Sequence, residues 1–343
     1  MVVPNWQTRF GSFPEIPLTK QWPNDLSTTR EQRIVHQLLT EQTATHGERQ
    51  ELKQLSSFYE ELRSSLKVMN YVNLGAEEVE RFKAYVLYAF NYAALVTNDL
   101  TLRSTYRLVL NESVTGKNHR ITEARYLGYP PREVVRKLNR YNRANTPETN
   151  LFYSSENVDT TLKELRPPLN RLVTLGIWEP RTTHPFVSYP ISHERAIGVN
   201  EGVEKALGAF TSRRQHVDPQ VYDYLRYYLE VIGGEYVKPV GHHQEYVVSA
   251  WLSERIFESR EHPWKFDCII YPSVGNDLRT DNIAMLPAVV DERLRLRGAV
   301  EFEVEEAFYD RTYSEHHPEQ ITLARVKNVV QARSIGVDGM IDW

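Results

Sequence analysis

Two separate stretches of the sequence end in side chains that could bind and cleave a polar ligand. In the first, an Arg-x-Asn turn (Arg143, Asn145) leads into an apolar strand, and a short helix with Glu164 follows. In the second, Phe266–Val274 is an apolar strand ending in Tyr-Pro-Ser, and Asn282 comes shortly afterwards. Arginine presents a planar fork that binds phosphate oxygens through two hydrogen bonds. The two stretches therefore mark a candidate site for a polar ligand.

Positive charge is concentrated just before the first stretch. Residues 101–143 contain ten Lys or Arg and three Glu, a local charge of +7, whereas the 343-residue chain has a net charge of −4. A basic face on an otherwise acidic protein suits a small polyanion better than a long nucleic acid, and a solvated surface is the simpler alternative for each residue taken singly. RNA binding by this segment stays an alternative, and it predicts an affinity that falls steeply with salt.

In this order, the fragments resemble the RES domain, a family named for its Arg, Glu and Ser. The resemblance covers about Thr105 to Val304. Its motifs are Tyr106-Arg107, Arg143-x-Asn145, Phe152-Tyr153-Ser154, Glu164-x-Arg166-Pro167, Tyr246-x-x-Ser249, Ile269-x-Tyr271-Pro272-Ser273 and Asn282. The resemblance implies a fold like that of ADP-ribosyltransferases, consumption of NAD, and often a role as the toxin of a toxin–antitoxin pair.

The resemblance also implies roles for particular residues. Cleavage of the nicotinamide–ribose bond builds positive charge on the ribose, which a carboxylate opposes. Glu164 would be that carboxylate, and Ser273 would be a hydrogen-bonding ligand. The positive charge of nicotinamide makes it a good leaving group, so no general acid is needed. The predicted catalytic residues are Glu164, Arg143 and Ser273. The predicted NAD contacts are Arg107 and Arg143 on phosphate, Tyr153 on the nicotinamide ring, and Asn145, Ser273 and Asn282.

We therefore expect an NAD glycohydrolase or phosphorylase, with NAD as substrate and a neutralising antitoxin as partner. An ADP-ribosyltransferase that modifies a protein and a non-catalytic nucleotide-binding module are the alternatives. A competing signal is Glu301-x-Glu303-x-Glu305, since Glu-x-Glu is a hallmark of arginine-directed ADP-ribosyltransferases. The acidic solvent face of an edge strand explains these residues equally well.

Metal and thiol chemistry are not favoured. The pairs His242-His243 and His316-His317 are adjacent, so their side chains diverge, and no His-Glu-x-x-His occurs. We expect no metal. The lone cysteine, Cys268, excludes a disulfide and a multi-cysteine zinc site. In an apolar strand it is expected to act as a small hydrophobe.

After residue 98, irregularly spaced β-rich runs alternate with helical stretches, and this predicts an α+β fold with a mixed or antiparallel sheet. The β-rich runs are 105–110, 151–153, 172–177, 268–271 and 299–304, and the helical stretches include 221–232 and 246–258. We expect an irregular arm over 1–27, a helical region over 28–98, the catalytic domain over 99–310 and a C-terminal helical extension over 311–343. That extension contains a closing helix from Glu319 to Arg333, stopped at Gly336.

The helical region carries an apolar stripe that could pack within the chain, against a partner or in a homodimer. Its members in the first helix are Leu52, Leu55, Tyr59, Leu62, Leu66 and Met69.

The longest nearly apolar run, Ala84–Val96, has 13 residues, fewer than the roughly 20 that a membrane-spanning helix needs. With no secretory signal at the start of the sequence, we expect a soluble cytoplasmic protein without a membrane partner.

Overall fold

The computed structural model describes most of the chain from residue 98 onward and scattered positions between 50 and 86. The described residues after 97 exclude 213, 215–217, 259–264 and 311–319. The chain divides into two compact units, Met1–Asn70 with Arg213–Val231, and Tyr71–Ser212 with Ile232–Trp343. The sheet and every predicted site residue belong to the second unit.

The predicted helical region is described only in part. The described positions between 50 and 86 are helical, and the side chains of Leu62, Leu66, Phe82 and Val86 are buried. The other members of the first apolar stripe and the predicted arm over 1–27 lie outside the described residues. Asn98, the last residue of the predicted region, belongs to strand β1, Asn98–Leu100.

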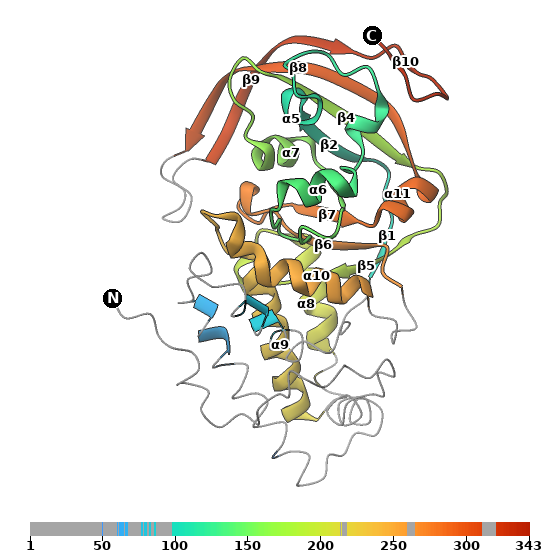
Figure 1. The fold of residues 1–343 in the computed structure, drawn as a ribbon. Coiled ribbons are helices and arrows are strands. Elements are labelled where there is room, and N and C mark those ends of the chain that lie inside the picture. Colours follow the sequence, from blue (N-terminus) through green and yellow to red (C-terminus); the bar gives the residue numbers. More distant parts are fainter. Residues whose placement is uncertain are drawn as a thin grey trace. The chain divides into compact units, whose positions relative to one another are not determined.

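In the part of the chain that the structure describes, one nine-stranded sheet has the order β1-β5-β6-β7-β3-β2-β4-β8-β9 (Figure 1). Strands β5 and β6 are parallel, and all other neighbours are antiparallel. The α+β class predicted from the sequence is therefore confirmed. The strands are β1 Asn98–Leu100, β2 Thr105–Leu110, β3 Phe152–Ser155, β4 Leu172–Pro180, β5 Phe186–Pro190, β6 Cys268–Pro272, β7 Asp281–Met285, β8 Leu294–Asp310 and β9 Gln320–Gln331. A separate two-stranded sheet consists of β10 Ser334–Ile335 and β11 Ile341–Asp342.

Helices connect and cover these strands. The α-helices are α5 Asn111–Thr115, α6 Arg132–Leu138, α7 Val158–Leu165, α8 Glu201–Ser212, α9 Pro219–Val237, α10 Val247–Glu258 and α11 Pro287–Arg293. Short 3-10 turns are η2 Ala124–Leu127, η3 Glu194–Ala196, η5 His243–Tyr246 and η6 Val274–Asn276. Among the described residues, no helix has both the length and the apolar character needed to cross a membrane.

Two apolar clusters hold the centre of the sheet. One surrounds Phe152 on β3 and includes buried residues of β5, β6 and β7. The other joins β2, β4 and β8, and Leu162 and Leu165 of α7 pack against it. The apolar side of α7 is therefore buried against the sheet, which fixes the helix that carries Glu164.

The register of the central strands brings distant parts of the chain together. Asn282 on β7 is paired with Ser155 on β3 and with Tyr271 on β6. On the other side of β3, Ser155 is paired with Tyr106 on β2. The predicted motifs on β2, β3, β6 and β7 thus lie on adjacent strands.

The predicted C-terminal helix is wrong, because Gln320–Gln331 is strand β9 and pairs with β8 (Figure 1). The segment is rich in β-branched residues, including Ile321, Val326, Val329 and Val330, which favour a pleated strand over a helix. The segment after β9 consists of β10, a turn and β11, so Gly336 belongs to a turn and does not end a helix. The described part of the predicted extension over 311–343 therefore consists of strands and turns and contains no helix.

Candidate active site

A cavity of about 330 Å³ lies beside the central strands and is lined by both charged and aromatic side chains. The lining residues are Arg107, Pro130, Val135, Asn142, Arg143, Asn145, Leu151, Tyr153, Glu164, Tyr246 and Tyr271. The structure thus brings together Arg107, Arg143, Asn145, Tyr153 and Glu164 from the predicted set. Ser273 and Asn282 do not line the cavity, but both bind Glu164 directly.

The carboxylate of Glu164 is held through one of its two oxygens. Its Oε1 accepts hydrogen bonds from Ser273 Oγ at 2.5 Å, Asn282 Nδ2 at 2.8 Å and the backbone N–H of Gly275 at 3.2 Å. Among the described residues, none donates to Oε2. Glu164 is exposed, whereas Ser273 is fully buried. The arrangement fixes the carboxylate group and leaves its second oxygen available to a ligand.

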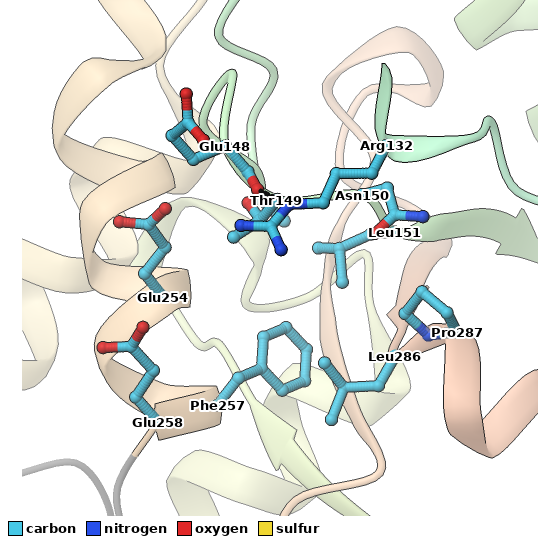
Figure 2. A pocket seen from close by; sticks show the side chains of 11 residues that line it. Arg132, Glu148, Thr149, Asn150, Leu151, Glu254, Phe257, Glu258, Leu286 and Pro287 are labelled. Atoms are coloured by element: carbon cyan, nitrogen blue, oxygen red, sulfur yellow. Dashed lines mark hydrogen bonds between the residues drawn. The ribbon is translucent and has the colours of Figure 1, made fainter. Parts of the chain in front are cut away.

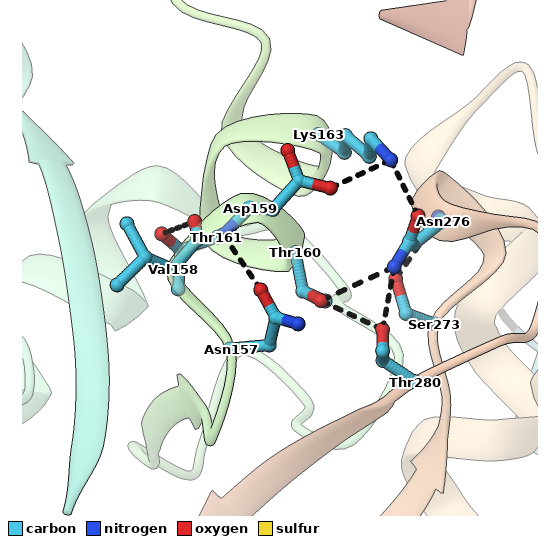
Figure 3. Close-up of polar contacts among 9 residues, drawn as sticks. All are labelled: Asn157, Val158, Asp159, Thr160, Thr161, Lys163, Ser273, Asn276 and Thr280. Atoms are coloured by element: carbon cyan, nitrogen blue, oxygen red, sulfur yellow. Dashed lines mark hydrogen bonds and ion pairs between the residues drawn. The ribbon is translucent and has the colours of Figure 1, made fainter. Parts of the chain in front are cut away.

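Helix α7 places Glu164 at this position through its ends and its apolar side. The side chain of Asn157 caps the start of the helix by accepting a hydrogen bond from the N–H of Asp159 at 2.8 Å (Figure 3). Arg166, at the C-terminal end, has a φ of 46° and accordingly leaves the helical conformation. The helix therefore ends just after Glu164, in front of the Pro167-Pro168 pair that cannot continue it.

Arg107 on β2 is a cation with no acidic partner in the part of the chain that the structure describes. Its NH1 group donates to the backbone oxygen of Tyr153 at 3.0 Å, and its guanidinium lies 5.6 Å from the ring centroid of Phe152. Its Nε atom is buried and has no hydrogen-bond partner among the described residues. Burial lowers the pKa of Arg107 to about 10, so the group remains charged at neutral pH. A buried donor of this kind favours an anionic ligand.

Arg143 is engaged differently from the phosphate fork that the sequence predicts. Its NH1 group donates to the backbone oxygens of Tyr236 at 2.6 Å and Lys238 at 3.2 Å. Its guanidinium also lies 4.8 Å from the ring centroid of Tyr246. Arg143 lines the cavity, but one of its terminal nitrogens donates to backbone oxygens at the end of α9. Arg107 therefore has more of its donors available to a ligand.

Tyr153 and Asn145 support each other at the wall of the cavity. The Tyr153 hydroxyl donates to Asn145 Oδ1 at 2.8 Å and accepts from the N–H of Ala144 at 3.0 Å. The Asn145 amide donates to the backbone oxygens of Thr146 and Thr149. Burial raises the pKa of the Tyr153 hydroxyl. The pair holds the loop that carries Arg143, and the Tyr153 ring lines the cavity as a neutral aromatic surface.

Tyr246, Tyr271 and Gly275 are site residues that were not predicted. The two tyrosines lie within motifs already noted in the sequence, Tyr-x-x-Ser and Ile-x-Tyr-Pro-Ser, so a signal for them exists. Gly275 contributes only its backbone N–H. A backbone donor leaves no mark in residue type, and sequence reasoning could not find it.

A second cavity of about 280 Å³ shares Leu151 with the first but has the opposite charge. Figure 2 shows Glu254 and Glu258 on α10 facing Leu286 and Pro287 across it. Its other lining residues are Arg132, Ala144, Glu148, Thr149, Asn150, Leu151 and Phe257. With three glutamates and one arginine, this cavity disfavours a diphosphate, whereas the first cavity contains two arginines and one glutamate.

The competing Glu-x-Glu residues occupy other surroundings. Strand β8 pairs with both β4 and β9, so it is not the edge strand that one interpretation required. Glu301 is buried and binds Arg120 at 2.9 Å and Asn111 at 3.2 Å. Glu303 accepts a hydrogen bond from Asn328 on β9 at 2.9 Å. Neither these two nor Glu305 lines the cavity.

Two of the described histidines and the lone cysteine occupy structural positions. His193 and His242 accept backbone hydrogen bonds at the starts of η3 and η5. Cys268 is fully buried, and burial raises the pKa of its thiol. Within the described residues, no group of three or more His, Cys, Asp or Glu could hold a metal ion.

No protein-family model, curated protein or solved structure matches the chain. The class assigned by the fold is therefore only α+β with a mixed sheet. The resemblance to the RES family stays a prediction that rests on the quoted motifs and residues.

Proposed function

We propose that the chain is an NAD-consuming enzyme of the RES type, with an ADP-ribosyltransferase-like fold, and that it cleaves the bond between nicotinamide and ribose. The observation that carries this proposal is that one cavity contains both a carboxylate and a cation. Glu164, whose Oε2 accepts no hydrogen bond from a described residue, and Arg107, which has no acidic partner among these residues, both line it. NAD needs a carboxylate near its anomeric carbon and a cation near its diphosphate.

In the proposed reaction the bond from ribose C1′ to the pyridinium nitrogen breaks. The electron pair goes to nicotinamide, which leaves neutral, and positive charge develops on the ribose. Glu164 opposes that charge, and its three neutral donors hold it without adding a positive charge of their own. Water or inorganic phosphate then bonds to C1′, and one proton passes to solvent when water is the acceptor.

Arg107 binds the diphosphate in this proposal, and Arg143 supports the wall beside it. Arg107 donates to one backbone carbonyl and has an Nε–H without a partner among the described residues, whereas NH1 of Arg143 is held by two backbone carbonyls. The aromatic rings of Tyr153, Tyr246 and Tyr271 offer apolar faces to the nicotinamide ring. Since NAD is a cytoplasmic metabolite, we place this activity in the cytoplasm.

Incubating the purified chain with NAD and measuring free nicotinamide by chromatography tests the proposal. Separate reactions contain buffer alone, inorganic phosphate, or a mixture of candidate protein acceptors with labelled NAD. We expect release above that of Glu164→Gln in the first or second reaction. If nicotinamide is released only when acceptor proteins are present, and these proteins become labelled, the chain is an ADP-ribosyltransferase instead. Absence of release in all three contradicts the proposal, and tight NAD binding by calorimetry would then favour a non-catalytic module.

The predicted role as a toxin has a cellular test. Expression in a bacterial host should lower cellular NAD and arrest growth, and the Glu164→Gln variant should do neither at equal protein abundance. Growth arrest by both proteins would mean that NAD consumption is not its cause.

A further inference from the structure

Helix α7 is fastened to the turn η6 by a set of polar side chains (Figure 3). Thr160 Oγ1 and Thr280 Oγ1 share a hydrogen bond at 2.6 Å. Asn276 Nδ2 donates to Thr280 Oγ1 at 2.8 Å and to Thr160 Oγ1 at 3.4 Å. Thr160 and Asn276 are buried. The side chain of Asn276 therefore joins the first turn of α7 to the segment leading into β7.

A second connection reaches the residue next to Glu164. Lys163 Nζ donates to Asn276 Oδ1 at 2.7 Å and pairs with Asp159 at 2.7 Å. Both ends of the Asn276 amide are thus used, one toward Lys163 and one toward the threonines. Because Lys163 directly precedes Glu164, this bond restrains the backbone from which the carboxylate extends.

The same turn also holds the carboxylate itself. The backbone N–H of Asn276 donates to Ser273 Oγ at 3.2 Å. Ser273 Oγ accepts there, so its own proton is directed to Glu164 Oε1 at 2.5 Å. The neighbouring N–H of Gly275 donates to that oxygen at 3.2 Å. The position of η6 relative to α7 therefore sets the geometry of two of the three bonds to Glu164.

Independent support comes from how closely the two segments approach. A Cβ atom on Gly275 would lie 3.0 Å from the backbone oxygen of Lys163 and 3.1 Å from Glu164 Cδ. Both distances are shorter than ordinary contacts, and the first involves backbone that cannot rotate away. A side chain at position 275 would therefore require η6 and α7 to separate by a few tenths of an ångström.

We propose that Asn276 is a positioning residue for Glu164, acting by locking η6 to α7. This inference rests on the proposed function, since it names what orients the carboxylate of that reaction. Asn276 does not line the cavity, so its loss changes the placement of Glu164 and leaves the diphosphate-binding Arg107 in place. Catalysis is sensitive to such placement, and a shift of about 1 Å can cost on the order of 10²-fold in rate.

The test compares Asn276→Ala with Asn157→Ala, a matched control on the same helix. Asn157 is exposed, caps the start of α7 and makes no contact with Glu164. Both substitutions should lower Tm, because each removes a bond that stabilises α7. Only Asn276→Ala should lower kcat for nicotinamide release, by roughly 10- to 100-fold, with KM changed less than about twofold.

A second variant, Gly275→Ala, tests the same geometry without removing a hydrogen-bonding group. It should also lower kcat more than KM, because the added methyl group pushes η6 and α7 apart. If Asn276→Ala does not fold, this variant decides. Suppose that the wild type releases nicotinamide and that every variant that folds has a kcat within about twofold of the wild-type value. This result overturns the inference and leaves the proposed function standing. No release by the wild type removes both.

Discussion

Replacing Glu164 with glutamine separates the charge of this residue from its hydrogen bonds. The side-chain oxygen of glutamine can accept all three bonds that Oε1 accepts, from Ser273, Asn282 and the N–H of Gly275. The amide nitrogen then occupies the position of Oε2, which has no donor among the described residues. Glu164→Gln should therefore fold normally and differ from the wild type mainly in the charge presented to the cavity.

The expected loss is in kcat. A single electrostatic contact that acts mainly in the transition state is worth about 3–4 kcal/mol, or 10²–10³ in rate. Since the ground state of NAD makes less use of that charge, KM should change little. The assay is nicotinamide release over a range of NAD concentrations, with Tm measured on the same preparations.

Glu164→Ala should behave differently, and this provides the control on folding. It removes the acceptor for the fully buried Ser273 hydroxyl and for the Asn282 amide. Each buried donor left without a partner costs about 1–3 kcal/mol, so this variant should lose both Tm and kcat. A Glu164→Gln variant with the Tm loss of Glu164→Ala would contradict the assigned geometry.

Glu303→Gln is the matched control on chemistry. Glu303 accepts a hydrogen bond from Asn328 and does not line the cavity, so its substitution should leave kcat unchanged. Turnover that persists in Glu164→Gln and disappears in Glu303→Gln would refute the reasoning and favour the Glu-x-Glu alternative.

Three further predictions concern binding and stability. Arg107→Lys keeps the charge but loses the planar fork of the guanidinium group, so KM for NAD should rise roughly 10- to 100-fold with little change in kcat. This is the effect of losing a charged hydrogen bond of about 1.5–3 kcal/mol. An unchanged KM would exclude Arg107 as the diphosphate ligand. Burial raises the pKa of Asp281, which accepts a hydrogen bond from Asn200. The folded protein therefore binds a proton at this carboxylate more tightly than the unfolded chain does. The free energy of unfolding falls as pH rises through the pKa of the folded state. Asp281→Asn should therefore raise Tm at pH 7, by a margin that shrinks toward pH 4, and a margin independent of pH would show that burial of the charge is not its cause. Glu301→Ala should lower the free energy of unfolding by about 2 kcal/mol without changing kcat, since it leaves an amide N–H of the buried Asn111 without its acceptor. Denaturant unfolding and the nicotinamide assay check the two parts.

Local pattern was sufficient for much of the fold. The predicted runs at 105–110, 172–177 and 268–271 lie within β2, β4 and β6. The stretches at 221–232 and 246–258 correspond to α9 and α10. These segments are long or strongly patterned, so the local sequence is sufficient to predict their secondary structure.

Strand β9 shows where local pattern fails. A helix after Pro318 satisfied the start and stop signals in the sequence, but the backbone of Gln320–Gln331 pairs with β8 instead. Intrinsic propensities differ by less than about 1 kcal/mol per residue. The pairing and packing supplied by β8 are larger, and they are invisible until the topology is known. Strands β5 and β7 were missed for a related reason. Pro190 in β5 and Asp281 and Asn282 in β7 are residue types of low strand propensity, and the pairing with β6 that stabilises both strands is not visible in the local pattern.

The candidate site divides in the same way. Motif order predicted which residues would lie near one another, but not the atoms that hold them, since Ser273 and Asn282 reach Glu164 across 109 and 118 positions of sequence. The Arg-x-Asn spacing favoured Arg143 as a phosphate fork. Its bonds to the carbonyls of Tyr236 and Lys238 span more than 90 positions and could not be anticipated.

The site holds its two opposite charges with neutral partners. Glu164 is bound by a hydroxyl, an amide and a backbone N–H, and Arg107 by a backbone carbonyl. Among the described residues, neither side chain forms an ion pair. Had they paired with each other, each would have neutralised the other, and a ligand would have had to break that pair to bind. Kept apart, the two charges suit a ligand with a diphosphate at one point and a developing cation at another. This is the charge distribution of NAD during loss of nicotinamide, and it is why we place binding on Arg107 and chemistry on Glu164.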